Sequence, residues 1–393
     1  MRKAILFLGV GNLNIGIIDI AQKQGYATIC VNRDQDSASL EKADLSKVQD
    51  SGDIASILDF VFLEAGNFDI KLVYSGSEFF VAKETVSYAL GLPHNSLPTA
   101  FAGENKQVMK TLFTKHRVPA PQGVIVSNFA EAAKSAKQLK YPVIIKPTNK
   151  LGGLGVGVSH NEHGLKAAFE AARTHSKVVV VERFYEGSLH DVNGFFYDGS
   201  FFRAGISDKK ASVGSSKYVS ELTCPSTLSA KQKDQLYRLL EKSAKALGIV
   251  CGPIKGDAIL SREGFLMMEV GLRFHGPLGS LFCLPYGEGF LPFEYYLKTI
   301  NCKNFKFKKT NKFVLIKQIS VKPGIIKKVE GEARAKKVSG VVDILLQKKI
   351  GDRIGKIKSN YDVVGYVVIC AKDRDSAQQI YIKFLRTFQV IVE

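Results

Sequence analysis

The sequence has no long apolar run and no cluster of metal-binding side chains. Its six cysteines lack a Cys-x-x-Cys pair and its seven histidines do not group, which argues against a zinc site and favours reduced thiols in the cytoplasm. No stretch approaches the roughly 20 apolar residues that a membrane span requires. The apolar run after Arg2 and Lys3 breaks at residues 9–12 with no small-x-small cleavage site, so it predicts a first β-strand rather than a secretion signal.

Signatures of covalent catalysis are also missing. The sequence has neither a Gly-x-Ser-x-Gly elbow nor a Cys/His signature, so no side-chain nucleophile is indicated. Acidic residues are few: 37 stand against 55 lysines and arginines, a net charge of +18. Such a surface attracts polyanions, but aromatics are not interleaved with the lysines of residues 303–358 as in a base-stacking platform. We favour a solvated lysine-rich surface and expect no nucleic-acid partner.

Length and pattern indicate a multidomain α/β and α+β protein. A chain of 393 residues, 45% of them hydrophobic, predicts two or three globular domains. The N-terminal part alternates predicted strands with helical patterns, as in an open α/β, Rossmann-like domain. The strands are residues 4–8, 28–31 and 72–74, and the helices are residues 15–24 and 54–64. Turn-forming residues at 91–98 mark its end.

A glycine turn follows the first predicted strand. Its glycines are Gly9, Gly11 and Gly16. A dinucleotide fingerprint would need its third glycine where Asn14 stands, so we interpret the turn as packing for the first helix. An NADP-dependent oxidoreductase, with Arg33 reading a 2′-phosphate, remains an alternative.

The strongest local signal is a strand that ends on a lysine before a glycine-rich loop. The strand at residues 143–146 ends on Lys146, and the loop contains Gly152, Gly153 and Gly155. Glycines let backbone N–H groups approach phosphate oxygens, and the lysine can reach the same phosphates. No Gly-Lys-Ser/Thr closes the loop and no helix opens behind it, so it is not a P-loop.

The flanking elements carry further candidates. Residues 101–116 predict one amphipathic helix, with Lys106 near its start, where the helix dipole disfavours a cation unless an anion lies nearby. A four-valine strand at residues 178–181 ends on Glu182, an edge that suits a flat aromatic ligand such as adenine. Helices are also predicted at residues 130–139 and 165–173.

A hairpin further along carries two acids. Residues 262–264 predict a three-residue loop, a register that pairs Ser261 with Phe265 and Asp257 with Glu269. Like charges directly opposite each other are destabilising, so we expect a cation between them. Oxygen ligands suit Mg²⁺, with Mn²⁺ as an alternative ion. Without metal, we expect amide replacements to leave the protein equally stable or slightly more stable.

Arg273 follows this hairpin on the same face. Strand periodicity places Gly271 and Arg273 on the side of Glu269. The planar fork of arginine suits a carboxylate or a phosphate. A weak surface cluster of Asp, Glu and Arg is the alternative reading.

The order of these parts resembles the ATP-grasp ligases. The resemblance rests on a lysine in an early helix, a lysine before a glycine loop, a valine strand ending in Glu, and an Asp/Glu hairpin followed by Arg. Residues 321–326, the strand-rich stretch after them and a helix near residues 375–385 also resemble the small C-terminal domain of L-amino-acid ligases. The resemblance implies an N-terminal domain at 1–98, an ATP-grasp domain at 99–310 and a small α+β domain at 311–393.

The resemblance also implies ATP and Mg²⁺ as cofactors and a role for each candidate residue. Lys146 and Arg273 would be catalytic, and Asp257 and Glu269 would bind the metal. The nucleotide residues would be Lys106, Lys146, Gly152, Gly153, Gly155, Glu182, Arg183, Phe184 and Glu186. The substrate residues would be Arg273, His275, Gly276, Lys255 and Glu78.

Three positions depart from the family pattern. The usual third metal ligand, an Asn, is Gly271 here, and a histidine that often precedes the first metal acid by two is Lys255. The ribose-binding acid is replaced by Leu189, with Glu186 and Asp191 as nearby substitutes. These departures bear on the number of magnesium ions and on the acceptor substrate.

The implied activity is that of an ADP-forming ligase, joining a carboxylate to an amine through an acyl phosphate. We expect an amino acid as one substrate, small-molecule partners, a homodimer, a cytoplasmic location and no membrane attachment. A carboxylase or nucleotide-biosynthesis ligase on the same scaffold is the nearest alternative. A non-catalytic nucleotide- or nucleic-acid-binding protein is the alternative from another class.

Overall fold

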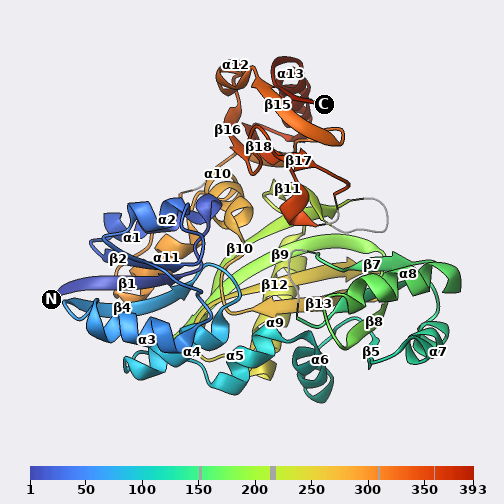
Figure 1. Cartoon of the computed structure of the whole chain (residues 1–393), viewed down its shortest axis with the longest axis horizontal. Helices are drawn as coiled ribbons and strands as arrows, with labels where there is room; N and C mark the ends of the chain where they lie inside the picture. Colours follow the sequence, from blue (N-terminus) through green and yellow to red (C-terminus); the bar gives the residue numbers. More distant parts are fainter. Residues whose placement is uncertain (150–152, 213–217, 309, 358) are drawn as a thin grey trace.

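The computed structural model describes residues 1–149, 153–212, 218–308, 310–357 and 359–393. Figure 1 shows an α/β unit at the N-terminal end, a broad central region and a C-terminal unit standing on the other two. A parallel sheet comes first in the chain and the later sheets are antiparallel, which confirms the predicted multidomain α/β and α+β class. No helix in the described ranges is both long enough and apolar enough to cross a membrane.

The N-terminal sheet is parallel, with strand order β3-β2-β1-β4. Its strands are β1 (Arg2–Leu8), β2 (Ala27–Asn32), β3 (Leu45–Val48) and β4 (Phe68–Ser75). The helical segments around it are η1 (Asn12–Asn14), α1 (Gly16–Lys23), α2 (Ala38–Lys42), α3 (Ile54–Leu63) and α4 (Phe80–Ala89). Residues 4–8 of β1 are fully buried, as expected for a parallel sheet covered on both faces. All three predicted strands of this region are confirmed.

The predicted single helix at residues 101–116 is wrong. The chain forms α5 (Leu97–Glu104) and α6 (Lys106–Lys115), separated at Asn105 in an extended conformation. The side chain of Asn105 accepts hydrogen bonds from the N–H groups of Gln107 and Val108, so it caps α6. The break makes Lys106 the first residue of α6, where its N–H donates to the carbonyl of Thr148.

A small antiparallel sheet follows, with strand order β5-β8-β6-β7. Its strands are β5 (Gly123–Val126), β6 (Val143–Pro147), β7 (Gly157–Ser159) and β8 (Val179–Arg183). Helices α7 (Phe129–Leu139) and α8 (Glu162–Arg173) pack on one face, against a core that includes Val143 and Val181. Side chains alternate along a strand, so Lys146 of β6 and Glu182 of β8 lie on the other face.

An eight-stranded sheet forms the centre of the molecule, with order β13-β12-β9-β10-β11-β14-β18-β16. Its strands are β9 (Gly187–Tyr197), β10 (Ser200–Ala211), β11 (Val219–Cys224), β12 (Gly252–Ser261), β13 (Gly264–Gly271), β14 (Phe313–Gln318), β16 (Val341–Leu346) and β18 (Gly365–Ala371). The long helix α9 (Ala230–Leu247), which the sequence reading missed, packs on β9 and β13. A capping box between Ser229 and Gln232 begins this helix, and Gly248 ends it at a φ of 81°.

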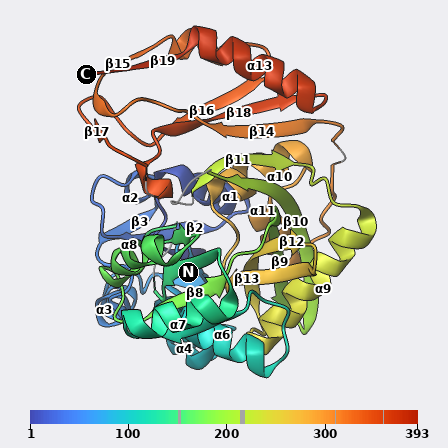
Figure 2. The ribbon, with the colours of Figure 1, turned by 90° about the vertical axis from the view of Figure 1, so that its right-hand side faces the viewer.

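The remaining segments connect or complete these sheets. After β13 come η2 (Leu278–Cys283), α10 (Leu284–Gly287) and α11 (Pro292–Ile300). The C-terminal unit adds a sheet of order β17-β15-β19 and two helices. These elements are β15 (Gly324–Glu330), α12 (Glu332–Lys336), β17 (Arg353–Ile354), η3 (Asn360–Asp362), α13 (Arg374–Thr387) and β19 (Gln389–Val392). Figure 2 shows α13 lying across the outer side of this unit.

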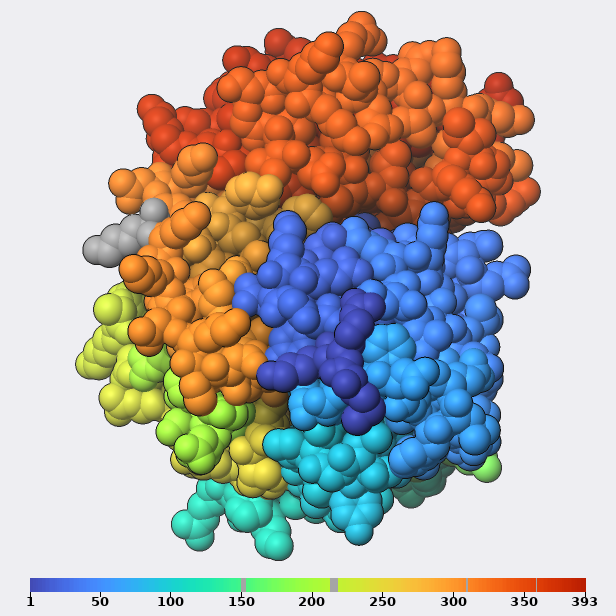
Figure 3. Space-filling model, turned by 90° about the vertical axis from the view of Figure 1, so that its left-hand side faces the viewer, coloured from blue at the N-terminus to red at the C-terminus, as the bar shows by residue number. Residues whose placement is uncertain are grey.

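The C-terminal unit shares the large sheet with the central region. Strand β11 pairs with β14, and β14 pairs with β18, so hydrogen bonding runs unbroken across residue 310. Figure 3 shows the C-terminal unit seated on the N-terminal unit and on the segment after β13. The boundaries at residues 98 and 310 stay a prediction.

Candidate active site

A hollow lies where the small sheet meets α6 and β13. Its lining is Lys106, Met109, Lys110, Phe113, Ala120, Pro121, Lys146, Glu182, Met267 and Met268. Charged groups and apolar side chains therefore share one small space. Such a lining suits a ligand with a flat apolar part and an anionic part.

Glu182 is the centre of charge in this hollow. Its carboxylate is buried and lies 2.5 Å from Nζ of Lys146 and 2.7 Å from Nζ of Lys110. Burial raises the pKa of Glu182, but Lys146 and Lys110 together outweigh burial and hold that pKa below its usual value. Two ammonium groups on one carboxylate leave one positive charge in excess, which favours an anionic ligand.

Lys106 joins this hollow to the acid hairpin. Its Nζ lies 3.3 Å from Oε2 of Glu269 on β13. The anion that the sequence reading expected near the start of the helix is therefore Glu269. Lys106 lines this hollow and contacts the predicted metal acid at the same time.

The hairpin places Asp257 opposite Glu269, as predicted, but by another route. The turn has two residues, Arg262 and Glu263, so Ser261 pairs with Gly264 and not with Phe265. A β-bulge between Asp257 and Ala258 then shifts the register. The shorter turn and the bulge offset each other, which restores the predicted acid pair.

A cation lies between the two acids, and it belongs to the protein. Nζ of Lys255 lies 2.9 Å from Oδ2 of Asp257 and 3.0 Å from Oε1 of Glu269. Burial lowers the pKa of Lys255, but the two carboxylates raise this pKa by more than burial lowers it, so the ammonium stays charged. Burial raises the pKa of Glu269, whereas Lys106 and Lys255 lower it to about 2.

A second lysine bridges Asp257 to β9. Nζ of Lys209 on β10 contacts a carboxylate oxygen of Asp257 and lies 2.5 Å from Oδ1 of Asp191 on β9. His275 completes this group, with its Nε2 3.4 Å from Asp191 and 3.8 Å from Asp257. Asp191, Asp257 and His275 bring three metal-ligand atoms within 4.8 Å of one another, but Lys209 already bridges the two acids.

Arg273 lies just beyond the end of β13 and faces the N-terminal unit. Its Nη2 lies 2.6 Å from Oε1 of Glu78, and its Nη1 donates to the carbonyl of Phe274. Arg273 and Glu78 are both largely buried, so their ion pair is poorly screened. This pair connects Glu78, in the N-terminal unit, to Arg273 beside the acid hairpin.

Comparison with known proteins supports the reading of these parts. Residues 105–192 match the family described as carbamoyl-phosphate synthase L chain, ATP binding domain. Residues 318–393 match the family described as L-amino acid ligase C-terminal domain 2. These two matches confirm the predicted resemblance to the ATP-grasp ligases over residues 105–192 and 318–393.

Solved structures show the same fold over whole chains. An L-amino acid ligase from Bacillus licheniformis matches with a TM-score of 0.84 and 18% identity, over 100% of both chains. An N5-carboxyaminoimidazole ribonucleotide synthetase from Thermotoga maritima matches at 0.77 and 18%, also over 100% of both chains. A phosphoribosylglycinamide synthetase from Anaerococcus prevotii matches at 0.74 and 19%, over the same full lengths. At these identities the structures establish the ATP-grasp fold.

The remaining nucleotide candidates lie at the end of β8 and in the glycine loop. The N–H groups of Arg183 and Phe184 donate to the carbonyls of Gln122 and Pro142, so neither N–H is available to adenine. The guanidinium of Arg183 lies 3.0 Å from Glu263 in the hairpin turn and stacks over Tyr185.

The other predicted nucleotide and substrate positions are a surface carboxylate and four glycines. Glu186 is exposed beyond β8, and Gly153 and Gly155 have φ values of 82° and 71°, which only glycine adopts readily. Gly152 lies outside the described residues. Gly276 accepts hydrogen bonds from the N–H groups of Gly279 and Ser280, so it begins the turn into η2.

Sequence reasoning missed two lysines of the site. Lys110 stands four residues after Lys106, a spacing that puts both on one face of α6 and that the sequence displays. Lys209 carries no such signal, because its contacts require β10, β9 and β12 to lie side by side.

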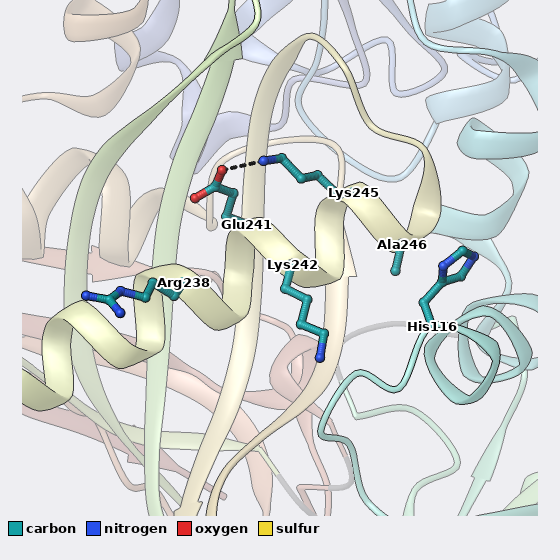
Figure 4. A pocket seen from close by; sticks show the side chains of 6 residues that line it. All are labelled: His116, Arg238, Glu241, Lys242, Lys245 and Ala246. Carbon is teal, nitrogen blue, oxygen red and sulfur yellow. Dashed lines mark hydrogen bonds and ion pairs between the residues drawn. The ribbon is translucent and has the colours of Figure 1, made fainter.

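A second hollow, of about 370 Å³, lies elsewhere on the surface (Figure 4). It is lined by His116, Arg238, Glu241, Lys242, Lys245 and Ala246. None of these is a predicted site residue, and the lysines are engaged: Lys245 pairs with Glu241 at 2.6 Å and Lys242 donates to the carbonyl of Arg117. This hollow carries no part of the candidate site.

Proposed function

We propose that this protein is an ATP-dependent carboxylate–amine ligase that forms an amide or peptide bond, with an amino acid as one substrate. The observation that carries the proposal is the position of Lys106, which lines the hollow with Lys146 and pairs with Glu269 of the acid hairpin. A nucleotide in the hollow would thus present its phosphates to the acids. The match of residues 318–393 to the L-amino acid ligase C-terminal domain favours an amino acid over other carboxylates.

The chemistry needs positioning and charge compensation rather than a side-chain nucleophile. A substrate carboxylate takes the γ-phosphoryl group of ATP and becomes an acyl phosphate, with ADP leaving. An amine then attacks the acyl carbon, phosphate leaves, and the amine loses a proton. Lys106 and Lys146 would offset the charge that develops on the phosphoryl oxygens.

The oxygen ligands of this site suit magnesium, but the ion would compete there with lysine side chains. Asp257 and Glu269 offer the oxygen ligands that it prefers, together with the phosphates of ATP. Both acids are already bonded to Lys255, and their other oxygens face Lys209 and Lys106. Bound metal would supply further charge neutralisation at the phosphates.

Arg273 would bind the carboxylate substrate and steady the acyl phosphate. Its guanidinium is held by Glu78 and by the carbonyl of Phe274, so its direction is fixed before substrate arrives. We also propose that the acceptor is a small-molecule amine, that the protein forms a homodimer and that it is located in the cytoplasm.

Release of phosphate from ATP, measured against a panel of amino acids and other carboxylates with amine acceptors, tests this function. We expect turnover only when a carboxylate and an amine are both present. Turnover with bicarbonate or a ribonucleotide substrate would instead favour a carboxylase or a nucleotide-biosynthesis ligase, since solved structures of such enzymes share this fold at 17–19% identity.

A further inference from the structure

Two unusual residues of the acid hairpin stand directly opposite each other. Lys255 of β12 pairs with Gly271 of β13 in the strand register. A Cβ atom at position 271 would lie 2.9 Å from Cε and 3.3 Å from Cγ of Lys255. The stem of the lysine therefore lies in the space that a side chain at position 271 would take, and the two residues fit as a unit.

This fit aims the ammonium at both acids. Only 6% of Lys255 is exposed, and its Nζ bonds to one oxygen of Asp257 and one of Glu269. The lysine thus performs a task usually left to a divalent ion, because it bridges two carboxylates that would otherwise repel each other across the strands.

The charges around the pair already balance. Three carboxylates, Asp191, Asp257 and Glu269, contact three ammonium groups, those of Lys106, Lys209 and Lys255. Each of the four carboxylate oxygens of Asp257 and Glu269 already faces a lysine ammonium, and Lys255 holds one oxygen of each acid. A divalent ion that used both acids at the position of Lys255 would have to displace this buried ammonium.

We propose that Lys255 and Gly271 together replace a second divalent ion, so that the protein binds one divalent ion per nucleotide. This inference rests on the proposed function, since it takes the hollow to bind nucleotide. The same two positions are the ones where the chain departs from the family pattern at the metal acids, and the structure shows them to be one cross-strand pair.

The number of ions is tested by equilibrium dialysis of the protein against a buffer that contains Mn²⁺ and saturating ADP, with the Mn²⁺ and ADP held in excess on the protein side measured together. We expect one Mn²⁺ per bound ADP for the wild type and two for Lys255→Met, which keeps the length of the stem but removes its charge. The matched control is Lys134→Met on the exposed side of α7, for which we expect one. Two ions on the wild type, or one on Lys255→Met, would overturn the inference.

A second measurement uses neither nucleotide nor activity. Thermal melts in Mn²⁺ alone should leave the wild type unchanged and raise the Tm of Lys255→Met by a few degrees, because a ligand of the folded state alone stabilises it. Equal responses of the two proteins would contradict the replacement of an ion by Lys255. If neither protein binds ADP, the proposed function fails while this melt still decides the role of Lys255.

A double variant tests the inference even if Lys255→Met does not fold. Lys255→His combined with Gly271→Asn installs the residue types that the family pattern has at both positions. We expect it to bind two Mn²⁺ per ADP, and one Mn²⁺ per ADP on the folded double variant would overturn the inference.

Discussion

Lys106 at the first position of α6 lies 3.3 Å from Glu269 of β13, so one ion pair joins the helix of the nucleotide hollow to the acid hairpin. The contact exists because Asn105 ends one helix and caps the next. The N–H group of Lys106 also donates to the carbonyl of Thr148. This bond connects the start of α6 to the chain just after β6, the strand that carries Lys146. Lys106 thus contacts the hollow, the acid hairpin and the chain after β6 at the same time.

Lys146→Ala should abolish nucleotide-driven phosphate release while leaving the protein folded. The loss of one charged contact to the phosphates should cost roughly 100-fold or more in rate. Stability should fall only modestly, because Glu182 keeps its 2.7 Å contact with Lys110. Turnover and thermal melts on the same preparation measure the activity and the stability of the variant. Unchanged turnover in the folded variant would contradict the assignment of the hollow to ATP.

Asp257→Asn and Glu269→Gln should each destabilise the metal-free protein, contrary to the expectation from sequence. Each change removes a carboxylate that contacts two largely buried lysines and leaves the cluster with one excess positive charge, which costs roughly 3 kcal/mol of unfolding free energy. Urea unfolding without metal measures the cost.

Glu263→Gln in the turn of the same hairpin is the matched control for these amides. Glu263 is about half exposed in its pair with Arg183, so its loss should cost under about 1 kcal/mol. Amide variants at 257 and 269 that are as stable as this control would show that the lysines do not stabilise the acids.

Acid should weaken the protein partly through Glu269. Its pKa falls from the usual 4.5 to about 2 on folding, so the folded state favours the ionised form. This stabilisation is complete above pH 4.5 and is lost as the pH falls toward 2. The difference in unfolding free energy between wild type and Glu269→Gln should therefore shrink across that window, and a difference that is constant with pH would contradict the lowered pKa.

Arg273→Lys should raise the KM of the carboxylate substrate about 10-fold or more and leave nucleotide binding unchanged. Lysine keeps the charge but loses the fork that bonds to Glu78 and to a carboxylate together. Arg203→Lys, in the surface pair with Asp234, is the control and should change neither quantity. A rise in the ADP dissociation constant alone would place Arg273 at the nucleotide instead.

The sequence predicted which two acids of the hairpin face each other, but it did not predict the turn and the bulge that bring them together. Opposed carboxylates were expected from the register of a three-residue turn. The turn has two residues instead, and the bulge after Asp257 restores the predicted pair. The need for a cation was also predicted from repulsion. Its identity was not, because Lys255 reaches both acids only when Gly271 stands opposite, which depends on the register.

Elements that depend on long-range packing were harder to predict. The helical pattern at residues 101–116 hides the break at Asn105, since helix periodicity continues across it. Strand β10 brings Lys209 to Asp191 and Asp257 through neighbours 18 and 48 residues away in the chain, and no local pattern encodes that pairing. Strands β1, β2 and β4 of the N-terminal sheet, by contrast, contain buried apolar runs and were predicted, whereas the more exposed β3 was not.

The central claim is that a carboxylate is activated as an acyl phosphate, and an oxygen-18 label tests it most directly. A carboxylate substrate labelled in both oxygens is incubated with ATP and an amine, and the products are analysed by mass spectrometry. We predict ADP, an amide, and one labelled oxygen in the released phosphate, because the bond between that oxygen and the acyl carbon breaks. AMP with pyrophosphate, or amide formed while phosphate stays unlabelled, would contradict the claim.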